Sequence, residues 1–153
     1  MKILISCLIL GLLVLLPGET TAGRCIPTPP DELGPFYTPD APVRSAVGKG
    51  YVLTGAVKSS ADCSAIAGAK LEIWMAGPDG QYADEYRATL FSDTSGRFRF
   101  ESHLSPTYYG RPPHIHIRAT ARGFRTLITQ HYPEQGRTEG MFDLVLVPEV
   151  VRK

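Results

Sequence analysis

Two histidines separated by one residue, His114 and His116, are the part of this sequence best suited to chemistry. The segment around them is typical of a β-strand, in which alternate side chains point to the same face, so that Ile115 and Ile117 face the other way, into a core. Two imidazoles about 7 Å apart on one face of a strand can bind a single metal ion. The pattern therefore indicates a metal site, although two histidines that only form hydrogen bonds would produce the same pattern.

The loop in front of this pair adds groups that suit a metal site. Pro112 and Pro113 cannot pair in the interior of a sheet, so they keep the approach to the strand as a loop. Arg111 then places a fixed positive charge within a few residues of the imidazoles. Tyr108 and Tyr109 offer phenol oxygens in the same loop.

The first 22 residues are predicted to be a secretory signal peptide and not part of the fold. Lys2 gives a positive start, residues 3–16 are almost unbroken apolar, and Thr20, Thr21 and Ala22 are small residues suited to cleavage. A retained N-terminal anchor is the alternative, but the apolar run is short for a membrane span. We therefore expect a secreted or periplasmic protein with no stable membrane partner.

The charge and the cysteines narrow the class of protein further. The formal net charge is +1, which argues against nucleic acid as a partner. Outside the predicted signal peptide the chain has two cysteines, Cys25 and Cys63. In an exported chain two cysteines most simply form one disulfide, here between an N-terminal arm and a loop. Free thiols as metal ligands are the alternative, but the two lack the spacing of a CxxC pair.

Residues 23–50 are expected to form an extended arm, because six prolines and little periodicity exclude a helix. Within the arm, Gly34-Pro35-Phe36-Tyr37 is an apolar and aromatic group of residues. It would pack the arm against the rest of the protein, or form the wall of a pocket.

Residues 51–153 are predicted to form a single β-domain. Strand patterns cover residues 51–57, 69–75, 97–100, 114–117, 125–130 and 142–147, with turn signals between most of them and no amphipathic helix. This pattern is typical of an all-β, single-domain β-sandwich of immunoglobulin or prealbumin type. The expected core residues are Leu71, Trp74, Phe98, Phe100, Ile115 and Leu146, with Trp74 in the core and not facing a cofactor.

Six motifs, occurring in one order along most of the chain, resemble the intradiol ring-cleavage dioxygenases, in particular their short secreted members. They are Gly34-Pro35-Phe36-Tyr37, Glu72-Ile73-Trp74, Asp79-Gly80-Gln81-Tyr82, Asp93-Thr94-Ser95-Gly96, the stretch from Tyr108 through Gly110-Arg111-Pro112-Pro113 to His114 and His116, and Thr129-Gln130-His131-Tyr132.

The resemblance implies a non-haem Fe(III) held by two tyrosines and two histidines, which here are Tyr82, Tyr108, His114 and His116. Tyr86 lies close to Tyr82 in the sequence, and Tyr109 is adjacent to Tyr108; each is the alternative at its position. Phenolate and imidazole ligands suit a hard, oxidised iron better than thiolates do. The resemblance also implies that Arg111 and Gln130 act on the substrate together with Tyr108, and that Pro35 and Tyr37 line the substrate pocket.

The implied reaction is cleavage of a catechol by O2 between its two hydroxyl-bearing carbons, which gives a muconate-type product. A metal-free, transthyretin-like binding module on the same scaffold is the main alternative. A secreted copper/zinc superoxide dismutase also uses two histidines in this pattern, but it needs about six histidines for two metals, and this chain has four.

Overall fold

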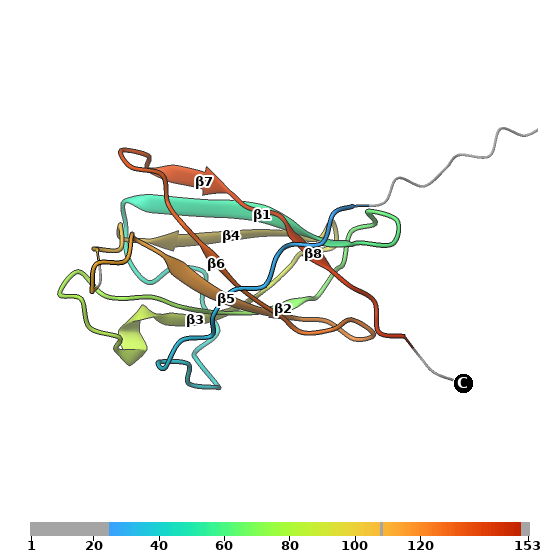
Figure 1. Cartoon of the computed structure of the whole chain (residues 1–153), viewed down its shortest axis with the longest axis horizontal. Helices are drawn as coiled ribbons and strands as arrows, with labels where there is room; N and C mark the ends of the chain where they lie inside the picture. The colour runs from blue at the N-terminus through green and yellow to red at the C-terminus, as the bar shows by residue number, and fades with distance from the viewer. Residues whose placement is uncertain (1–24, 108, 151–153) are drawn as a thin grey trace, which may run out of the picture.

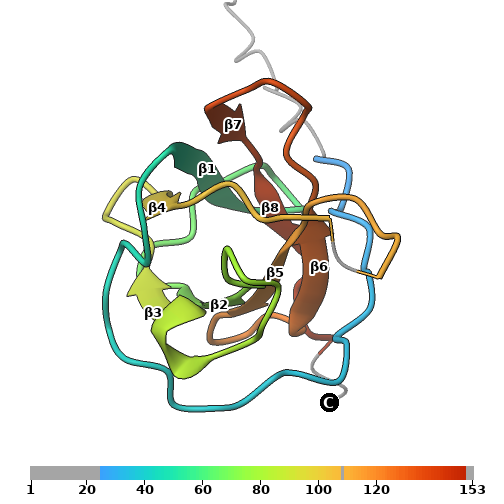
Figure 2. The same cartoon turned by 90° about the vertical axis from the view of Figure 1, so that its left-hand side faces the viewer.

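The computed structural model describes residues 25–107 and 109–150, which form two four-stranded sheets packed face to face (Figures 1 and 2). The predicted all-β sandwich is confirmed. Among the described residues, the only helical element is one short 3-10 turn at Asp84–Tyr86. None of their helical segments is long and apolar enough to cross a membrane. The predicted signal peptide lies outside the described residues.

One sheet is organised around the long strand β1 (Tyr51–Ser59). β4 (Arg97–Ser102) pairs with it antiparallel, whereas β7 (Glu139–Met141) and β8 (Leu144–Leu146) both pair with it parallel. Alternate β1 residues such as Tyr51, Leu53 and Val57 are buried between the sheets.

The other sheet is antiparallel throughout, in the order β3-β2-β5-β6. Its strands are β3 (Arg87–Phe91), β2 (Lys70–Trp74), β5 (Ile115–Thr120) and β6 (Leu127–His131). The histidine strand β5 is therefore central, with β2 and β6 on its two sides.

Five of the six residues predicted for the core, Leu71, Phe98, Phe100, Ile115 and Leu146, are buried between the sheets. Trp74 is buried as predicted, but it lies outside this cluster. Trp74 is buried, at 2% exposed, but on the outer face of its sheet, where its ring stacks on His116. The alternation of β2 explains this, because Leu71 and Ile73 take the core face and Trp74 takes the opposite one.

Residues 25–50 contain no strand and run along the outside of the sandwich, seen in blue and cyan in Figure 2. Their first part bonds to the β6 and β8 side, through Thr28 N to Val145 O and Asp31 N to Ile128 O. Their last part reaches the opposite edge, where Val43 bridges to Thr89 on β3.

Cys25 and Cys63 form a disulfide, as predicted from the sequence, with an S–S distance of 2.04 Å. The bond ties the start of the arm to the loop after β1. The disulfide therefore limits the movement of the arm relative to the sandwich.

We expect the double substitution Cys25→Ser, Cys63→Ser to lower the free energy of unfolding by about 4 kcal/mol, because the cross-link closes a loop with a sequence separation of 38 residues. Urea denaturation measures this loss. Ser64→Ala, in the same loop, should change stability by less than about 0.5 kcal/mol. A loss below about 1 kcal/mol in the double variant would show that the arm needs no covalent tether.

His131 and Tyr51 form a second link, this one between the two sheets. The Tyr51 hydroxyl lies 2.6 Å from Nε2 of His131, and Tyr51 is only 1% exposed. Burial lowers the pKa of His131 to about 4, against a smaller opposing effect of Glu134. The neutral ring is therefore the native form, and in the tautomer that carries its proton on Nδ1 it accepts the Tyr51 hydroxyl proton at Nε2.

This pKa predicts how acid affects stability. Because His131 binds a proton in the unfolded chain at a pKa near 6.5 and in the folded chain at about 4, its contribution to stability is present at neutral pH and is lost as the pH falls between these values. His131→Gln should therefore be less stable than wild type at pH 7. The difference should narrow by up to about 1.4 kcal/mol per pH unit in urea titrations between about pH 6 and 4.5. A constant difference would contradict the assignment.

Candidate metal centre

Three of the predicted ligands meet at one point on the outer face of the β3-β2-β5-β6 sheet. The Tyr82 hydroxyl lies 3.1 Å from Nε2 of His114 and 3.4 Å from Nε2 of His116. His116 lies on β5, and His114 is the residue just before the start of β5. Tyr82 comes from the loop between β2 and β3. The two isoleucines that alternate with the histidines, Ile115 and Ile117, are fully buried in the core, as predicted.

A tight turn returns Tyr82 to the sheet. Gly80 has a φ of 78°, a left-handed conformation that glycine adopts without strain. The Asp79 carboxylate accepts a hydrogen bond from Gln81 N, and Gly77 N donates to Gln81 O. The turn signal in the sequence therefore has a direct role in the site, because it sets where Tyr82 lies.

The three donor atoms fit a metal ion. His114 donates Nδ1–H to Pro112 O at 2.8 Å, which leaves the lone pair of Nε2 directed at the point shared with Tyr82. Two ligands that are each about 2.0–2.1 Å from one ion lie roughly 3 Å apart, close to the 3.1 and 3.4 Å between the phenol oxygen and the two nitrogens. The described residues contain no group of three His, Cys, Asp or Glu that could hold a metal, and the third donor at this point is the Tyr82 hydroxyl.

Both imidazoles are neutral and buried, each with 2% of its surface exposed. Burial lowers the pKa of His116 to about 4, and the neighbouring His114 adds to the shift. Burial is also the main cause that lowers the pKa of His114. The nearby backbone of Glu32 acts against burial and raises the pKa of His116. Nδ1 of His116 nevertheless has no hydrogen-bond partner of normal geometry among the described residues. Neutral imidazoles can bind a metal without first losing a proton.

Two aromatic rings that the sequence analysis did not assign to the site enclose it. Trp74 stacks on His116 with ring centroids 4.9 Å apart and planes 8° apart. Phe36, from the arm, stacks on Tyr82 at 4.4 Å and 14°. The alternation of side chains along β2 could have been used to predict that Trp74 faces away from the core. No local sequence pattern predicts that Phe36 contacts Tyr82.

The arm approaches the histidines closely at Gly34. A Cβ on this residue would lie 3.1 Å from Cε1 of His116, and its φ of 70° also favours glycine. Tyr37 lies one ring further out, against Trp74, and its hydroxyl donates to Glu72 at 3.2 Å. Pro35 is exposed. The pocket-lining role predicted for Pro35 and Tyr37 stays a prediction.

The structure brings Arg111 and Gln130 together beside the histidines. Arg111 donates from Nη2 to Oε1 of Gln130 at 2.7 Å and to the Tyr132 hydroxyl at 3.1 Å. Gln130 is 4% exposed, and its Nε2 donates to Glu32 O of the arm at 2.7 Å. Tyr132, whose ring is 6.2 Å from that of His114, was not assigned a role from the sequence.

The alternative tyrosines lie elsewhere or outside the described chain. Tyr86 packs edge-on against His103, with ring centroids 5.2 Å apart, so the structure favours Tyr82 over Tyr86. Tyr109 has a φ of 46° and is 89% exposed. Tyr108 lies outside the described residues, and its role as the second tyrosine ligand stays a prediction.

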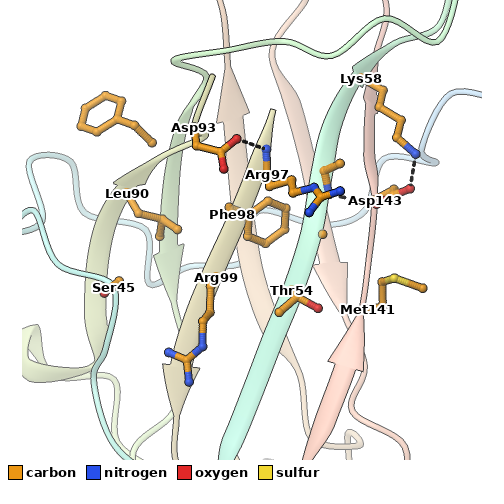
Figure 3. Close-up of a pocket in the computed structure, with 13 residues that line it drawn as sticks. Ser45, Thr54, Lys58, Leu90, Asp93, Arg97, Phe98, Arg99, Met141 and Asp143 are labelled. Carbon is orange, nitrogen blue, oxygen red and sulfur yellow. Dashed lines mark hydrogen bonds and ion pairs between the residues drawn. The ribbon is translucent and has the colours of Figure 1, made fainter. Parts of the chain in front are cut away.

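A separate groove of about 690 Å³ lies on the other sheet, along β1 and β4 (Figure 3). Its lining includes Thr54, Arg97, Arg99 and the Lys58–Asp143 ion pair, with an N–O distance of 2.6 Å. None of the residues predicted for the metal site lines this groove. This groove and the converging donor atoms are therefore different places on the protein.

Comparisons with known proteins agree with the geometry. The chain is 28% identical to a chlorocatechol 1,2-dioxygenase of Pseudomonas putida in an alignment 153 positions long, which covers 78% of this chain and 58% of that protein. It is 29% identical to an intradiol ring-cleavage dioxygenase of Aspergillus niger in an alignment 138 positions long, which covers 66% of this chain and 44% of that protein. The chain spans about half the length of these relatives. No family model matches it.

A solved structure extends the match to the fold. The dioxygenase domain of a dioxygenase carbohydrate-binding protein fusion from Streptomyces sp. SirexAA-E aligns with a TM-score of 0.73 and 28% identity, covering 81% of this chain and all of that domain. Sequence similarity, shared fold and the ordered motifs lead to the same conclusion. In sequence, in fold and in the order of its motifs, the chain is similar to the intradiol ring-cleavage dioxygenases.

Proposed function

We propose that this protein is a ferric dioxygenase that cleaves a catechol between its two hydroxyl-bearing carbons. Both atoms of O2 enter the product, a muconate-type dicarboxylic acid, and the carbon–carbon bond between the two hydroxyl-bearing carbons is broken. The observation that carries the proposal is the convergence of Tyr82, His114 and His116 on one point, in a chain whose relatives are named as catechol dioxygenases.

Tyr82, His114, His116 and Tyr108 are the residues that would hold the iron. Phenolate and imidazole together suit Fe(III), and coordination favours the ionised phenol. When bound, the iron would supply Lewis-acid activation of the catechol toward O2. The buried, neutral histidines support this assignment, because they would not exchange a proton when the metal binds.

The other residues of the site would act on the substrate. Arg111 places its guanidinium within hydrogen-bond reach of Gln130, beside the histidines, where it would stabilise negative charge that develops on the ring. Gln130 would orient the substrate. In accordance with the resemblance, the phenolate oxygen of Tyr108 would accept one proton from the catechol and become a neutral hydroxyl.

We also propose that the protein is exported. The apolar N-terminal segment after Lys2 and the Cys25–Cys63 disulfide support this, since disulfides persist in oxidising compartments. Expression with the full N-terminal segment, followed by N-terminal sequencing of protein from outside the cytoplasm, tests both export and cleavage after Ala22.

Iron analysis, visible absorption and product mass test the proposed reaction. Iron-loaded wild type should show a tyrosinate-to-iron absorption band and should convert catechol with incorporation of two oxygen atoms from ¹⁸O₂. Mutation of residues that only support metal ligands typically lowers metal affinity or activity about 10–100-fold. Because Tyr82 and His114 would bind the iron directly, Tyr82→Phe and His114→Ala should each lower kcat/KM by more than about 100-fold. His114→Ala should also lose iron, and Tyr82→Phe should shift the band.

Tyr86→Phe is the matched control, because Tyr86 is a neighbouring phenol that packs on His103, away from the histidine pair. It should keep the band, the iron content and the rate. If wild type binds no iron and gives no ring-opened product, the metal-free binding module is the correct description. If Tyr82→Phe keeps an unchanged band, Tyr82 is not a ligand.

A further inference from the structure

We propose that Tyr132, together with Asp31 of the arm, is a positioning residue that fixes the orientation of Arg111 and Gln130. This inference rests on the proposed function, which gives those two residues their work on the substrate. Tyr132 lies just after β6, and Asp31 is 101 residues away in the sequence. Neither residue is among the predicted ligands or substrate-contacting groups.

The Tyr132 hydroxyl joins three partners. It donates to Oδ2 of Asp31 at 2.9 Å and accepts from Nη2 of Arg111 at 3.1 Å. Oε1 of Gln130, also at 3.1 Å, competes for the single hydroxyl proton, but a carboxylate is the stronger acceptor. Burial and the adjacent Asp31 both raise the pKa of Tyr132. The phenol therefore stays protonated and keeps its role as a donor to Asp31.

These contacts fix which part of Arg111 faces the substrate. The two protons of Nη2 are used by Gln130 and Tyr132, at 2.7 and 3.1 Å. The N–H groups on Nε and Nη1 are then the ones left to face a ligand. Without the Tyr132 hydroxyl, Nη2 would keep a single partner, and the planar guanidinium could rotate about that bond.

Gln130 is held at both ends of its amide. Nε2 donates to Glu32 O at 2.7 Å, and Oε1 accepts from Arg111 at 2.7 Å. The side chain is thus prevented from flipping, and it is 4% exposed. Asp31 and Glu32 are neighbours on the arm. The packing of the arm against the sheet and the orientation of the Arg111–Gln130 pair therefore depend on each other.

The test is Tyr132→Phe, which removes the hydroxyl but keeps the ring beside His114. Thr129→Val is the matched control: Thr129 is the adjacent β6 residue to Gln130, and its hydroxyl donates to Pro29 O of the same arm at 3.0 Å without touching Arg111. Both variants therefore lose one bond between the arm and the end of β6, and only Tyr132→Phe loses the bond to Arg111.

The first readout is made on the metal-free, ¹⁵N-labelled full chain. Tyr132→Phe should shift and broaden the side-chain signals of Gln130 and the Nε–H signal of Arg111, whereas Thr129→Val should leave them unchanged. The second readout is made on the iron-loaded protein. There Tyr132→Phe should lower kcat for catechol about ten-fold with KM changed less than about two-fold, and Thr129→Val should keep the wild-type rate.

The outcomes separate this inference from the proposed function. If Tyr132→Phe loses only stability, and matches Thr129→Val in the NMR signals and in kcat, Tyr132 merely fastens the arm and the positioning role is wrong. If wild type cleaves no catechol, the proposed function fails, while the signals of Arg111 and Gln130 in the metal-free protein still decide whether Tyr132 positions them.

Discussion

The candidate site depends on one constraint: the outer face of the β3-β2-β5-β6 sheet must be buried even though it lies on the outside of the sandwich. The outward residues Glu72, Trp74 and His116 are each only 2–3% exposed. A sheet face that is covered on both sides normally carries apolar residues. Here the cover is the extended arm, so polar groups on that face must find partners within the protein.

Glu72 shows how the polar groups on this face are satisfied. Its carboxylate accepts from Lys70 at 3.1 Å and from Tyr37 at 3.2 Å, and it pairs with Arg118 of the neighbouring strand β5. Next to it, Trp74 and His116 stack on one another, and the indole nitrogen of Trp74 has no hydrogen-bond partner among the described residues. Along this face the paired carboxylate of Glu72 is followed by the unpaired nitrogens of Trp74 and His116, toward the end of the sheet at which the candidate site lies.

The local parts of this arrangement could be predicted from the sequence. Alternation alone places Ile115 and Ile117 in the core and the two histidines opposite, and the turn at Gly80 indicates that the chain returns to the sheet at Tyr82. Strand β3 was missed because Arg87–Phe91 has no alternation, being buried on both faces for four residues. Strand β7 was missed because Glu139–Met141 has three residues and no apolar pattern.

The contacts between distant segments could not be predicted, since they depend on where the arm lies. No local pattern connects Phe36 to Tyr82, or Asp31 to Tyr132, and neither contact involves an unusual residue type. The arm is positioned by backbone hydrogen bonds such as Asp31 N to Ile128 O, which almost any residue type other than proline could make. Only the ordered motifs of a related family indicate from sequence that this arm belongs to the site.

The same burial determines how the site would compete for a metal. An imidazole whose pKa has fallen to about 4 is almost never protonated at neutral pH, so a metal ion meets little competition from protons at His116. The charges nearby have opposite effects, because Arg111 lowers and Asp31 raises the pKa of both histidines. Tyr132 forms hydrogen bonds to both Arg111 and Asp31, so it holds the two opposing charges near one another. Burial remains the main cause of the lowered pKa values of the histidines. The arm therefore keeps the histidines neutral by excluding water from them, and the same arm, through Asp31 and Tyr132, holds Arg111 in place.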